Sequence, residues 1–397
     1  MSTPNGAAGP GGRRKDADGP GGRRRDRDGR VRVLWLIKGL GPGGAERLLV
    51  SAARAHDHSR FAISAAYLLP GKNALADDLR AAGVTVHCLD VRRPYDVGWP
   101  ARLRRLLVTS GFDIVHLHSP MVAGVARLVV RTLPKAQRPR VVTTEHNEWW
   151  SYVFPTRVVN AITFPLDDVH LAVSDDVRRS VPVRLRPRVQ TVVHGTAVDA
   201  ARAVRSQRRE VRAELGFGPD DVVVGTVANF RAQKGYPDLL AAVRIVADRV
   251  PRLHVVAVGQ GPLEAEIRAR HAELGLGDRF RFLGYRDDAL RVLAACDIFT
   301  LASLYEGYPV ALMEALAVGL PVVATAVGGV PDAVRQDVEG IVVPPSRPDL
   351  LAAALEELAI DPARRERMAA AALERGLQYD IVHAVRHIEA TYDRLKG

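Results

Sequence analysis

The 397 residues are 47% hydrophobic and 25% charged, which is typical of a soluble globular protein, and the formal net charge is +11. A chain of this length is too long for one compact core. The longest uncharged run, residues 315–331, is short and interrupted by proline and glycine, so the composition excludes a membrane-spanning helix. Cys88 and Cys296 lie far apart and offer neither a disulfide framework nor a metal-ligand spacing, and the N-terminus lacks the apolar core of a signal peptide, so we expect a cytoplasmic compartment.

The first thirty residues repeat a Gly-Pro-Gly-Gly-Arg-Arg unit at 9–14 and 19–24, with aspartates between the repeats. This segment contains no large apolar side chains that could anchor it to a core. Its composition therefore predicts a disordered tail over residues 1–30, whose arginines are either solvated or in contact with an anionic surface.

From residue 31 onward, short apolar runs alternate with amphipathic segments. The predicted strands of this first part are residues 31–37, 61–68, 84–89, 114–117, 141–144, 169–173 and 189–193. The predicted helices between them are residues 45–55, 73–82, 101–109 and 122–132. This alternation predicts a doubly wound parallel α/β sheet, a Rossmann-like domain over residues 31–200.

The same pattern starts again after residue 200. The predicted strands are residues 222–227, 254–258, 279–282, 298–301, 321–324 and 341–343. The predicted helices are residues 237–249, 263–274, 287–295, 310–317, 331–335 and 348–359. They predict a second Rossmann-like domain over residues 201–380, facing the first across a cleft, and a terminal helix in residues 381–397 that packs back on the first domain.

The positive charge is concentrated in the first domain. Residues 31–200 contain 23 basic and 14 acidic side chains, whereas residues 201–397 contain 25 basic and 27 acidic side chains. The asymmetry points to an anionic partner for the first domain, which would be a nucleic acid, a phospholipid surface or a lipid-phosphate substrate. An arginine-rich solvated surface would give the same count.

A glycine-rich loop, residues 39–47, follows the first predicted strand and formally contains a G-x-G-x-x-G pattern. A dinucleotide site would need an acidic residue at the end of the next strand, but no acid follows that strand before Asp77. What remains is a turn at a helix start, where the amides of Gly43 and Gly44 suit an anionic phosphate. A purely structural tight turn would look similar.

The most specific cluster surrounds the strand that ends at residue 301. Glu306 and Glu314 lie eight residues apart, and between them Pro309 stands where a helix would begin. Backbone amides at Gly307, Tyr308 and Val310 would face a diphosphate at this position. The two carboxylates would accept hydrogen bonds from sugar and ribose hydroxyls.

Residues 31–395 resemble glycosyltransferase family 4, whose members are retaining enzymes of the GT-B fold. The spacing of Glu306 and Glu314 matches the family's E-x7-E motif, and residues 41–47 match its N-terminal Gly-Gly-Ala-Glu-Arg loop. Residues 113–118 and 192–199 match further family blocks. The resemblance implies that Glu314 binds the donor ribose and that Glu306 binds a hydroxyl of the donor sugar.

Residues 229–235 correspond to the family's diphosphate clamp, an arginine about five residues before a Lys-Gly pair. Lys234 and Gly235 match, but Asn229 stands at the usual arginine position. We therefore assign Lys234 and the nearby Arg231 to the departing diphosphate. Lys234 as a simple exposed helix cap is the alternative.

Histidines mark the cleft side of the first domain. His146 ends a predicted strand and resembles the family histidine beside the donor sugar, where it would donate to a hydroxyl or stabilise developing charge. A loop histidine with no chemical role is the alternative. We expect His116 and His118 to point to opposite faces of their strand, with His118 contacting the acceptor.

Further acceptor contacts are expected just around His146. Glu145 precedes it, and Trp149 and Trp150 follow in an aromatic run suited to a sugar or a lipid headgroup. The same aromatics could equally be core anchors of a helix that packs on the sheet.

The sequence thus predicts a retaining glycosyltransferase that moves a sugar from a nucleotide diphosphate to a lipid-linked or other cell-envelope glycan. No cofactor is expected, and no metal either, because beyond the tail the chain carries no D-x-D carboxylate pair. We expect peripheral contact with an anionic membrane at the inner face of the plasma membrane and no specific nucleic acid. A sugar-nucleotide epimerase, a non-catalytic GT-B protein and a nucleic-acid-binding protein remain alternatives.

Overall fold

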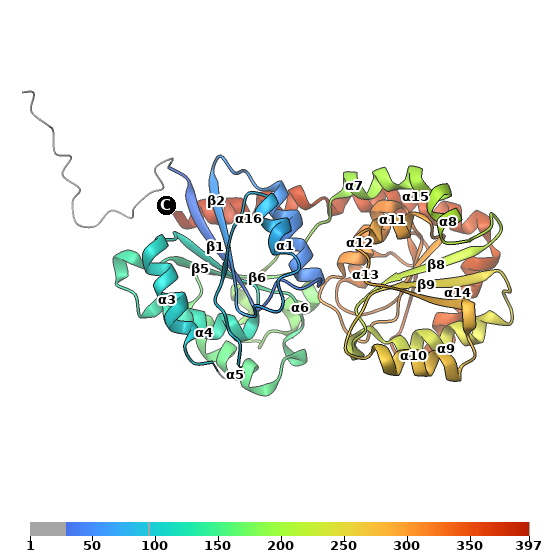
Figure 1. Cartoon of the computed structure of the whole chain (residues 1–397), viewed down its shortest axis with the longest axis horizontal. Coiled ribbons are helices and arrows are strands. Elements are labelled where there is room, and N and C mark those ends of the chain that lie inside the picture. The colour runs from blue at the N-terminus through green and yellow to red at the C-terminus, as the bar shows by residue number, and fades with distance from the viewer. Residues whose placement is uncertain (1–28, 94–95, 397) are drawn as a thin grey trace, which may run out of the picture.

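The computed structural model describes residues 29–93 and 96–396, which form two α/β halves side by side (Figure 1). The sheet of the first half is entirely parallel, in the order β3-β2-β1-β4-β5-β6-β7. Its strands are β1 Val31–Ile37, β2 Phe61–Tyr67, β3 Thr85–Cys88, β4 Ile114–Leu117, β5 Arg140–Glu145, β6 Val169–Ala172 and β7 Val189–Thr191. The order reverses beside β1, which places ligand-binding loops at its carboxyl end.

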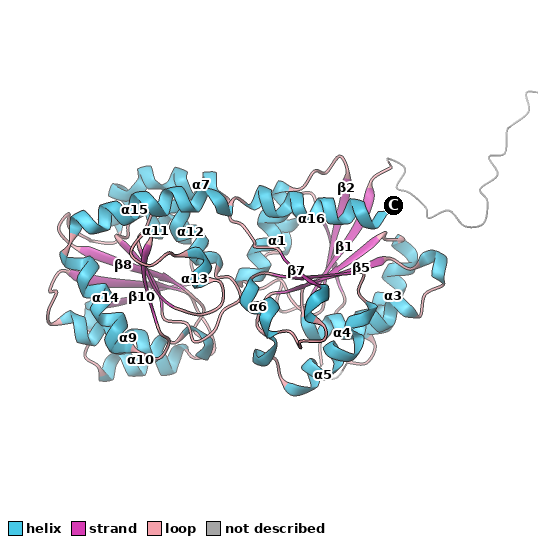
Figure 2. Cartoon of the chain, turned by 180° about the vertical axis from the view of Figure 1, so that it is seen from behind, coloured by secondary structure: helices cyan, strands magenta, loops and turns pink. Residues whose placement is uncertain are grey.

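The second half contains a six-stranded parallel sheet in the order β10-β9-β8-β11-β12-β13. Its strands are β8 Val222–Val227, β9 Leu253–Val258, β10 Phe280–Gly284, β11 Ile298–Leu301, β12 Val322–Thr325 and β13 Gly340–Val343. The central strands are continuous apolar runs because helices cover both faces of the sheet, as Figure 2 shows.

Sixteen α-helices connect the strands in the described part of the chain. In the first half they are α1 Gly44–Ala55, α2 Ala76–Ala81, α3 Trp99–Ser110, α4 Pro120–Arg131, α5 Phe154–Thr163 and α6 Asp175–Ser180, and α7 Val198–Ala203 follows the first crossing and contacts α12 of the second half. The remainder are α8 Arg208–Glu214, α9 Tyr236–Ala247, α10 Glu264–Glu273, α11 Ala289–Ala294, α12 Val310–Val318, α13 Val330–Ala333, α14 Pro348–Ile360, α15 Pro362–Gly376 and α16 Ile381–Lys396.

These elements confirm the predicted fold class. Each of the thirteen strands in the described residues overlaps one predicted range, with ends that differ by at most two residues. Five helices, α5, α6, α7, α8 and α15, are absent from the prediction, and the predicted tail lies almost wholly outside the described residues.

The last helix, α16, lies against the first half although it follows the second half in sequence (Figure 1). The indole of Trp35 in β1 donates to the hydroxyl of Tyr392 at 3.2 Å. The chain returns at Asp380, which forms a β-bridge with Thr196 next to the first crossing between the halves. On these contacts we propose domain limits near residues 200 and 380.

Candidate active site

A cavity open to solvent lies between the two halves. Its walls from the first half are Pro42, Gly44 and Arg47, and its walls from the second half are Val227, Ala228, Asn229, Lys234, Val258, Gly259, Tyr285, Arg286, Ala289, Leu301, Pro309, Val310, Ala311 and Glu314. The site therefore combines the carboxyl ends of β1, β8, β9 and β11, where parallel α/β sheets bind ligands.

Two helices begin at the wall of this cavity. Helix α1 starts at Gly44 and α12 at Val310, and a Cβ atom placed on Gly44 would lie 3.5 Å from Cγ2 of Val310. The residues before them, Gly43 and Pro309, have no side-chain acceptor with which to cap the first-turn amides. The dipoles of both helices thus favour an anion such as a diphosphate between them, although at the start of α1 the Glu46 carboxylate lies next to Gly43 and accepts from its own amide.

Lys234 and Glu306 form an ion pair at the edge of the cavity. The Lys234 Nζ donates to Oε1 of Glu306 at 2.5 Å, and the hydroxyl of Ser303 donates to the same oxygen at 2.6 Å. Glu306 is buried, whereas Lys234 is half-buried and lines the cavity. The structure thus brings together these two predicted site residues, and it leaves the ammonium within reach of a bound anion.

Two glycines allow the loops that carry this pair to approach other backbone segments. Gly235 has a φ of +60°, and a Cβ on it would lie 2.0 Å from the carbonyl oxygen of Ala302. A Cβ on Gly307 would lie 2.0 Å from the carbonyl oxygen of His146, across the cleft. No side chain fits at either position, so the glycines set the positions of Lys234 and Glu306.

Glu314 lies on α12, half-buried, and its side chain helps to line the cavity. Burial raises the pKa of Glu314 to about 7, and the positive charge of Arg47 partly opposes that rise. The carboxyl is therefore close to half-protonated near neutral pH. The side chain of Tyr308 does not line the cavity. It is buried, and its hydroxyl donates to that of Tyr379 at 2.8 Å.

Arg47, Tyr285 and Arg286 also line the cavity, although the sequence did not mark them as site residues. The Arg47 Nη2 donates to the Tyr285 hydroxyl at 3.2 Å and to the Arg286 carbonyl at 3.4 Å. These bonds join the two halves across more than 230 positions of sequence. Arg47 does belong to the glycine-loop motif at residues 41–47, and this motif was the feature of the sequence that could have marked it as a site residue.

The two candidates for the missing clamp arginine lie in different places. Asn229 is part of the cavity wall, whereas Arg231 is exposed and is not among the lining residues. Burial raises the pKa of Glu46, and a hydrogen bond from its own backbone amide and the charges of Lys72 and Arg231 oppose that rise.

Three histidines form a chain beside the cleft. Nδ1 of His118 lies 3.2 Å from Nε2 of His146, and Nδ1 of His146 lies 3.2 Å from Nε2 of His194. Burial lowers the pKa of His146 to about 4, so its ring is neutral at pH 7. Both ring nitrogens of His146 are thus engaged by other imidazoles, and a sugar hydroxyl would have to displace one of them.

The predicted opposite orientation of His116 and His118 is wrong. Their ring centroids lie 4.2 Å apart, because residues two positions apart in a strand share one face. His116 contacts the Tyr392 hydroxyl at 2.6 Å and the Thr144 hydroxyl at 2.7 Å. His118 is buried, and within the described part of the chain its Nε2 has no hydrogen-bond partner.

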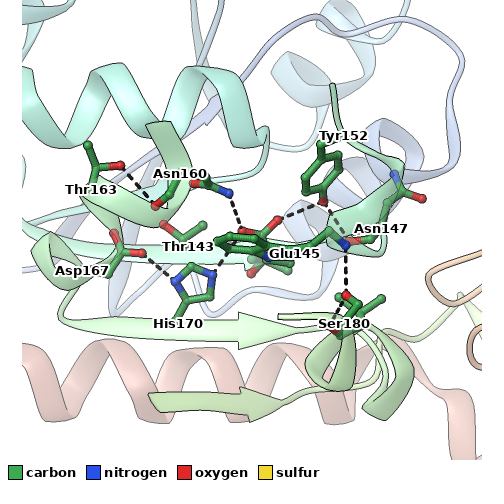
Figure 3. Close-up of polar contacts among 12 residues, drawn as sticks. Thr143, Glu145, Asn147, Tyr152, Asn160, Thr163, Asp167, His170 and Ser180 are labelled. Carbon is green, nitrogen blue, oxygen red and sulfur yellow. Dashed lines mark hydrogen bonds and ion pairs between the residues drawn. The ribbon is translucent and has the colours of Figure 1, made fainter. Parts of the chain in front are cut away.

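Glu145 lies inside the first half and not at an accessible acceptor position (Figure 3). Its carboxylate, 1% exposed, accepts from the Tyr152 hydroxyl and the Asn160 amide at 2.9 Å and lies 3.2 Å from Nε2 of His170. Burial opposes its charge, yet the bond and the charge of His170 hold the pKa of Glu145 below its usual range. We therefore correct its predicted role: Glu145 positions the strand end before His146 and has no open path to an acceptor.

The two tryptophans after His146 separate in space. Trp149 is 3% exposed and packs on Phe164, whereas Trp150 is 54% exposed. The Trp150 ring meets that of Tyr305 from the second half in a T-shaped contact at 5.0 Å. Trp150 therefore lies at the cleft rim, and Trp149 is one of the core anchors foreseen as the alternative.

Among residues 29–93 and 96–396, no three His, Cys, Asp or Glu side chains are grouped so as to hold a metal ion. In the same described part of the chain, no helix is both long and apolar enough to cross a bilayer.

Comparison with known families and proteins gives matches over both halves. The family model described as Glycosyltransferase Family 4 matches residues 42–202, and the one described as Glycosyl transferases group 1 matches residues 207–375. The chain is 26% identical over 247 residues to the N-acetyl-alpha-D-glucosaminyl L-malate synthase of Bacillus anthracis, a match that covers 61% of this chain and 64% of that protein.

Two further similarities cover more of the chain. The UDP-Gal:alpha-D-GlcNAc-diphosphoundecaprenol alpha-1,3-galactosyltransferase of Escherichia coli is 24% identical over 293 residues, which are 69% of this chain and 73% of that one. The crystal structure of Anabaena Alr3699/HepE in complex with UDP and glucose superposes with a TM-score of 0.81 at 20% identity, covering 92% of this chain and all of the other. The chain belongs to glycosyltransferase family 4 and has the GT-B fold.

Proposed function

We propose that this glycosyltransferase moves a sugar from a nucleoside diphosphate onto a lipid-linked or other cell-envelope glycan, with retention of anomeric configuration. The observation that carries the proposal is the cavity in which the N-termini of α1 and α12, Lys234 and Glu314 converge. A relative named for UDP-Gal and a diphosphoundecaprenol acceptor supports both substrate classes.

The residues divide the donor between them in this proposal. Glu314 accepts hydrogen bonds from the ribose, and the diphosphate lies between the starts of α1 and α12. Lys234 neutralises the diphosphate of the donor instead of pairing with Glu306. Glu306, released from that pair, can accept a hydrogen bond from a sugar hydroxyl. These groups supply the positive potential that a divalent metal would otherwise provide, so we propose a metal-independent transfer.

Retention would follow from attack on the face that the diphosphate leaves. The bond between the anomeric carbon and the β-phosphate oxygen breaks, and its electron pair goes to that oxygen. The acceptor hydroxyl oxygen bonds to the anomeric carbon on the same side and passes its proton to the departing phosphate. Anomeric coupling constants of the product, measured by NMR, test this step, and an inverted product would contradict it.

A thermal-shift series with UDP, GDP and ADP tests the donor site. Because a ligand that binds only the folded state raises apparent stability by about 2.7 kcal/mol at ~100 times its Kd, one of the three should raise the Tm measurably. We expect UDP to do so, since the similar Anabaena chain was crystallised with UDP. The substitution Glu314→Gln should reduce the shift, and Ile360→Ser, at an exposed site on α14, should not. Absence of a shift with all three nucleotides would contradict the proposal.

A further inference from the structure

Helix α5 is inverted relative to an ordinary surface helix. Its polar residues Thr156, Asn160 and Thr163 are buried, whereas Phe154 is 68% exposed and Ile162 is 72% exposed. Amphipathic helices of soluble proteins place their apolar side inward. Here the apolar side faces outward.

The buried ionic network explains why the polar side faces inward. Arg127 of α4 donates to both carboxylate oxygens of Asp167 at 2.7 Å and to the side chains of Asn160 and Thr163 on α5. Since side chains four positions apart share one face of a helix, burying Asn160 leaves the opposite face to Phe154 and Ile162. The core dictates the orientation of α5 but provides no cover for its outer face.

The exposed apolar surface continues beyond α5. The neighbouring α4 exposes Met121 and Leu128, and the loop before α5 exposes Val153 at 65%. Figures 1 and 2 both show α4 and α5 next to each other on the same edge of the first half. An apolar groove runs along α5 to Trp150 at the cleft rim. Exposed apolar side chains that gather along such a groove usually mark an interaction site and are seldom left facing water.

The charges around this surface are mainly positive. Residues 114–198 contain eleven basic and six acidic side chains, an excess of five positive charges. Lys135 and Arg131 are exposed at the end of α4, and Arg157 lies on α5 itself. Asp168 is paired with Arg140 at 2.9 Å, Asp175 and Asp176 are paired with arginines of α6, and Asp167 and Glu145 lie inside the buried network. Glu148, next to Trp149, is the one acidic side chain of residues 114–198 that forms no ion pair in the described part of the chain.

We propose that the outer face of α5, with the exposed ends of α4, docks on the anionic headgroup surface of a phospholipid bilayer. Phe154, Val158 and Ile162 enter the interface while the surrounding arginines and lysine contact lipid phosphates. A second copy of the chain fits this face poorly, because its own basic rim would meet an identical one. The proposed function gives the docking its purpose, since a lipid-linked acceptor would then reach the cleft from the Trp150 side.

Vesicle co-sedimentation of the full-length chain tests the docking. Vesicles of phosphatidylglycerol and phosphatidylcholine should bind the protein, and pure phosphatidylcholine should bind it weakly. The double variant Phe154→Ser/Ile162→Ser should bind anionic vesicles about tenfold or more weakly, since two apolar side chains no longer enter the interface. Lys135→Glu should weaken binding mainly at low salt. The matched control Ile360→Ser removes an equally exposed isoleucine (67%) from α14 of the second half and should bind like the wild type.

The outcomes separate this inference from the proposed function. Equal binding of the double variant and the wild type to anionic vesicles would overturn the inference, as would wild-type protein that stays in the supernatant. A dimer in sedimentation velocity that dissociates in the double variant would assign the face to self-association and overturn it too. The nucleotide-induced Tm shift should be the same in the double variant, which shows that the variant is folded and that the donor site does not depend on the lipid result.

Discussion

Helices α5 and α9 make a direct comparison between the two halves. Each follows a cleft loop and has proline at its second position, Pro155 in α5 and Pro237 in α9. Helix α9 buries Leu239, Leu240 and further apolar side chains against its sheet, whereas α5 buries polar groups and exposes apolar ones. Two helices that begin in the same way are therefore an ordinary core helix in one half and an inverted helix in the other.

The difference comes from what lies beneath each helix. Under α5 the side chains of Arg127, Asp167, His170 and Glu145 form one buried ionic network. Although burial opposes its charge, the carboxylates of Asp167 and Glu145 raise the pKa of His170 above its usual value. Under α9 the core is apolar. The packing of α5 thus depends on an ionic network, whereas that of α9 depends on apolar contacts.

Removal of one member of the ionic network should have the largest effect on folding. Arg127→Met leaves Asp167 buried without its bidentate partner, and breaking such a pair destabilises proteins by about 3–5 kcal/mol. The free energy of unfolding from urea denaturation measures the change. The matched control in the second half is Arg249→Met, which breaks an exposed pair with Glu356 and should change stability by about 1 kcal/mol or less. Equal losses in the two variants would contradict the contrast between the halves.

The second half should respond in activity more than in stability. Lys234→Met removes the cation at the diphosphate position, and loss of one such group lowers kcat by about 10²–10³-fold. Initial rates of nucleoside diphosphate release, measured at saturating donor, show the effect. Arg231→Met is the matched control, because Arg231 is exposed and outside the cavity wall. If Arg231→Met reduced kcat as strongly as Lys234→Met, the exposed position of Arg231 would not be its position during catalysis.

The sequence predicted both sheets because buried parallel strands are continuous apolar runs that need no knowledge of their neighbours. It also predicted Lys234, Glu306 and Glu314 as site residues, because their spacing is local and tied to a strand end and a helix start. These are properties of short segments, and the structure places Lys234 and Glu314 on one cavity wall.

Features that depend on distant contacts were not predictable in this way. The orientation of α5 is set by Arg127 and Asp167, which lie in other elements, so its amphipathic pattern gives no indication that it is inverted. The role of Glu145 was misjudged for the same reason, since its partner His170 belongs to the next strand. Arg47 reaches Tyr285 only because the two halves pack together, and no local signal connects them.

The smallest expected effect is a pH dependence of donor binding that only the second half provides. Burial raises the pKa of Glu314 to about 7, and a carboxylate that accepts ribose hydroxyls binds in its ionised form. Nucleotide affinity should therefore rise as pH increases through that value, by up to about tenfold per pH unit below it. Stability should change in the opposite sense: between the ordinary carboxyl pKa of 4.5 and about 7 the folded state binds more protons than the unfolded state, so the free energy of unfolding falls as pH rises.

Calorimetric titrations with UDP across this range should show both proton release and the rise in affinity, and Glu314→Gln should remove them. An affinity of the unsubstituted chain that stays constant from pH 6 to 8 would place the ribose away from Glu314, and the two halves would then no longer differ in how they use a buried carboxyl.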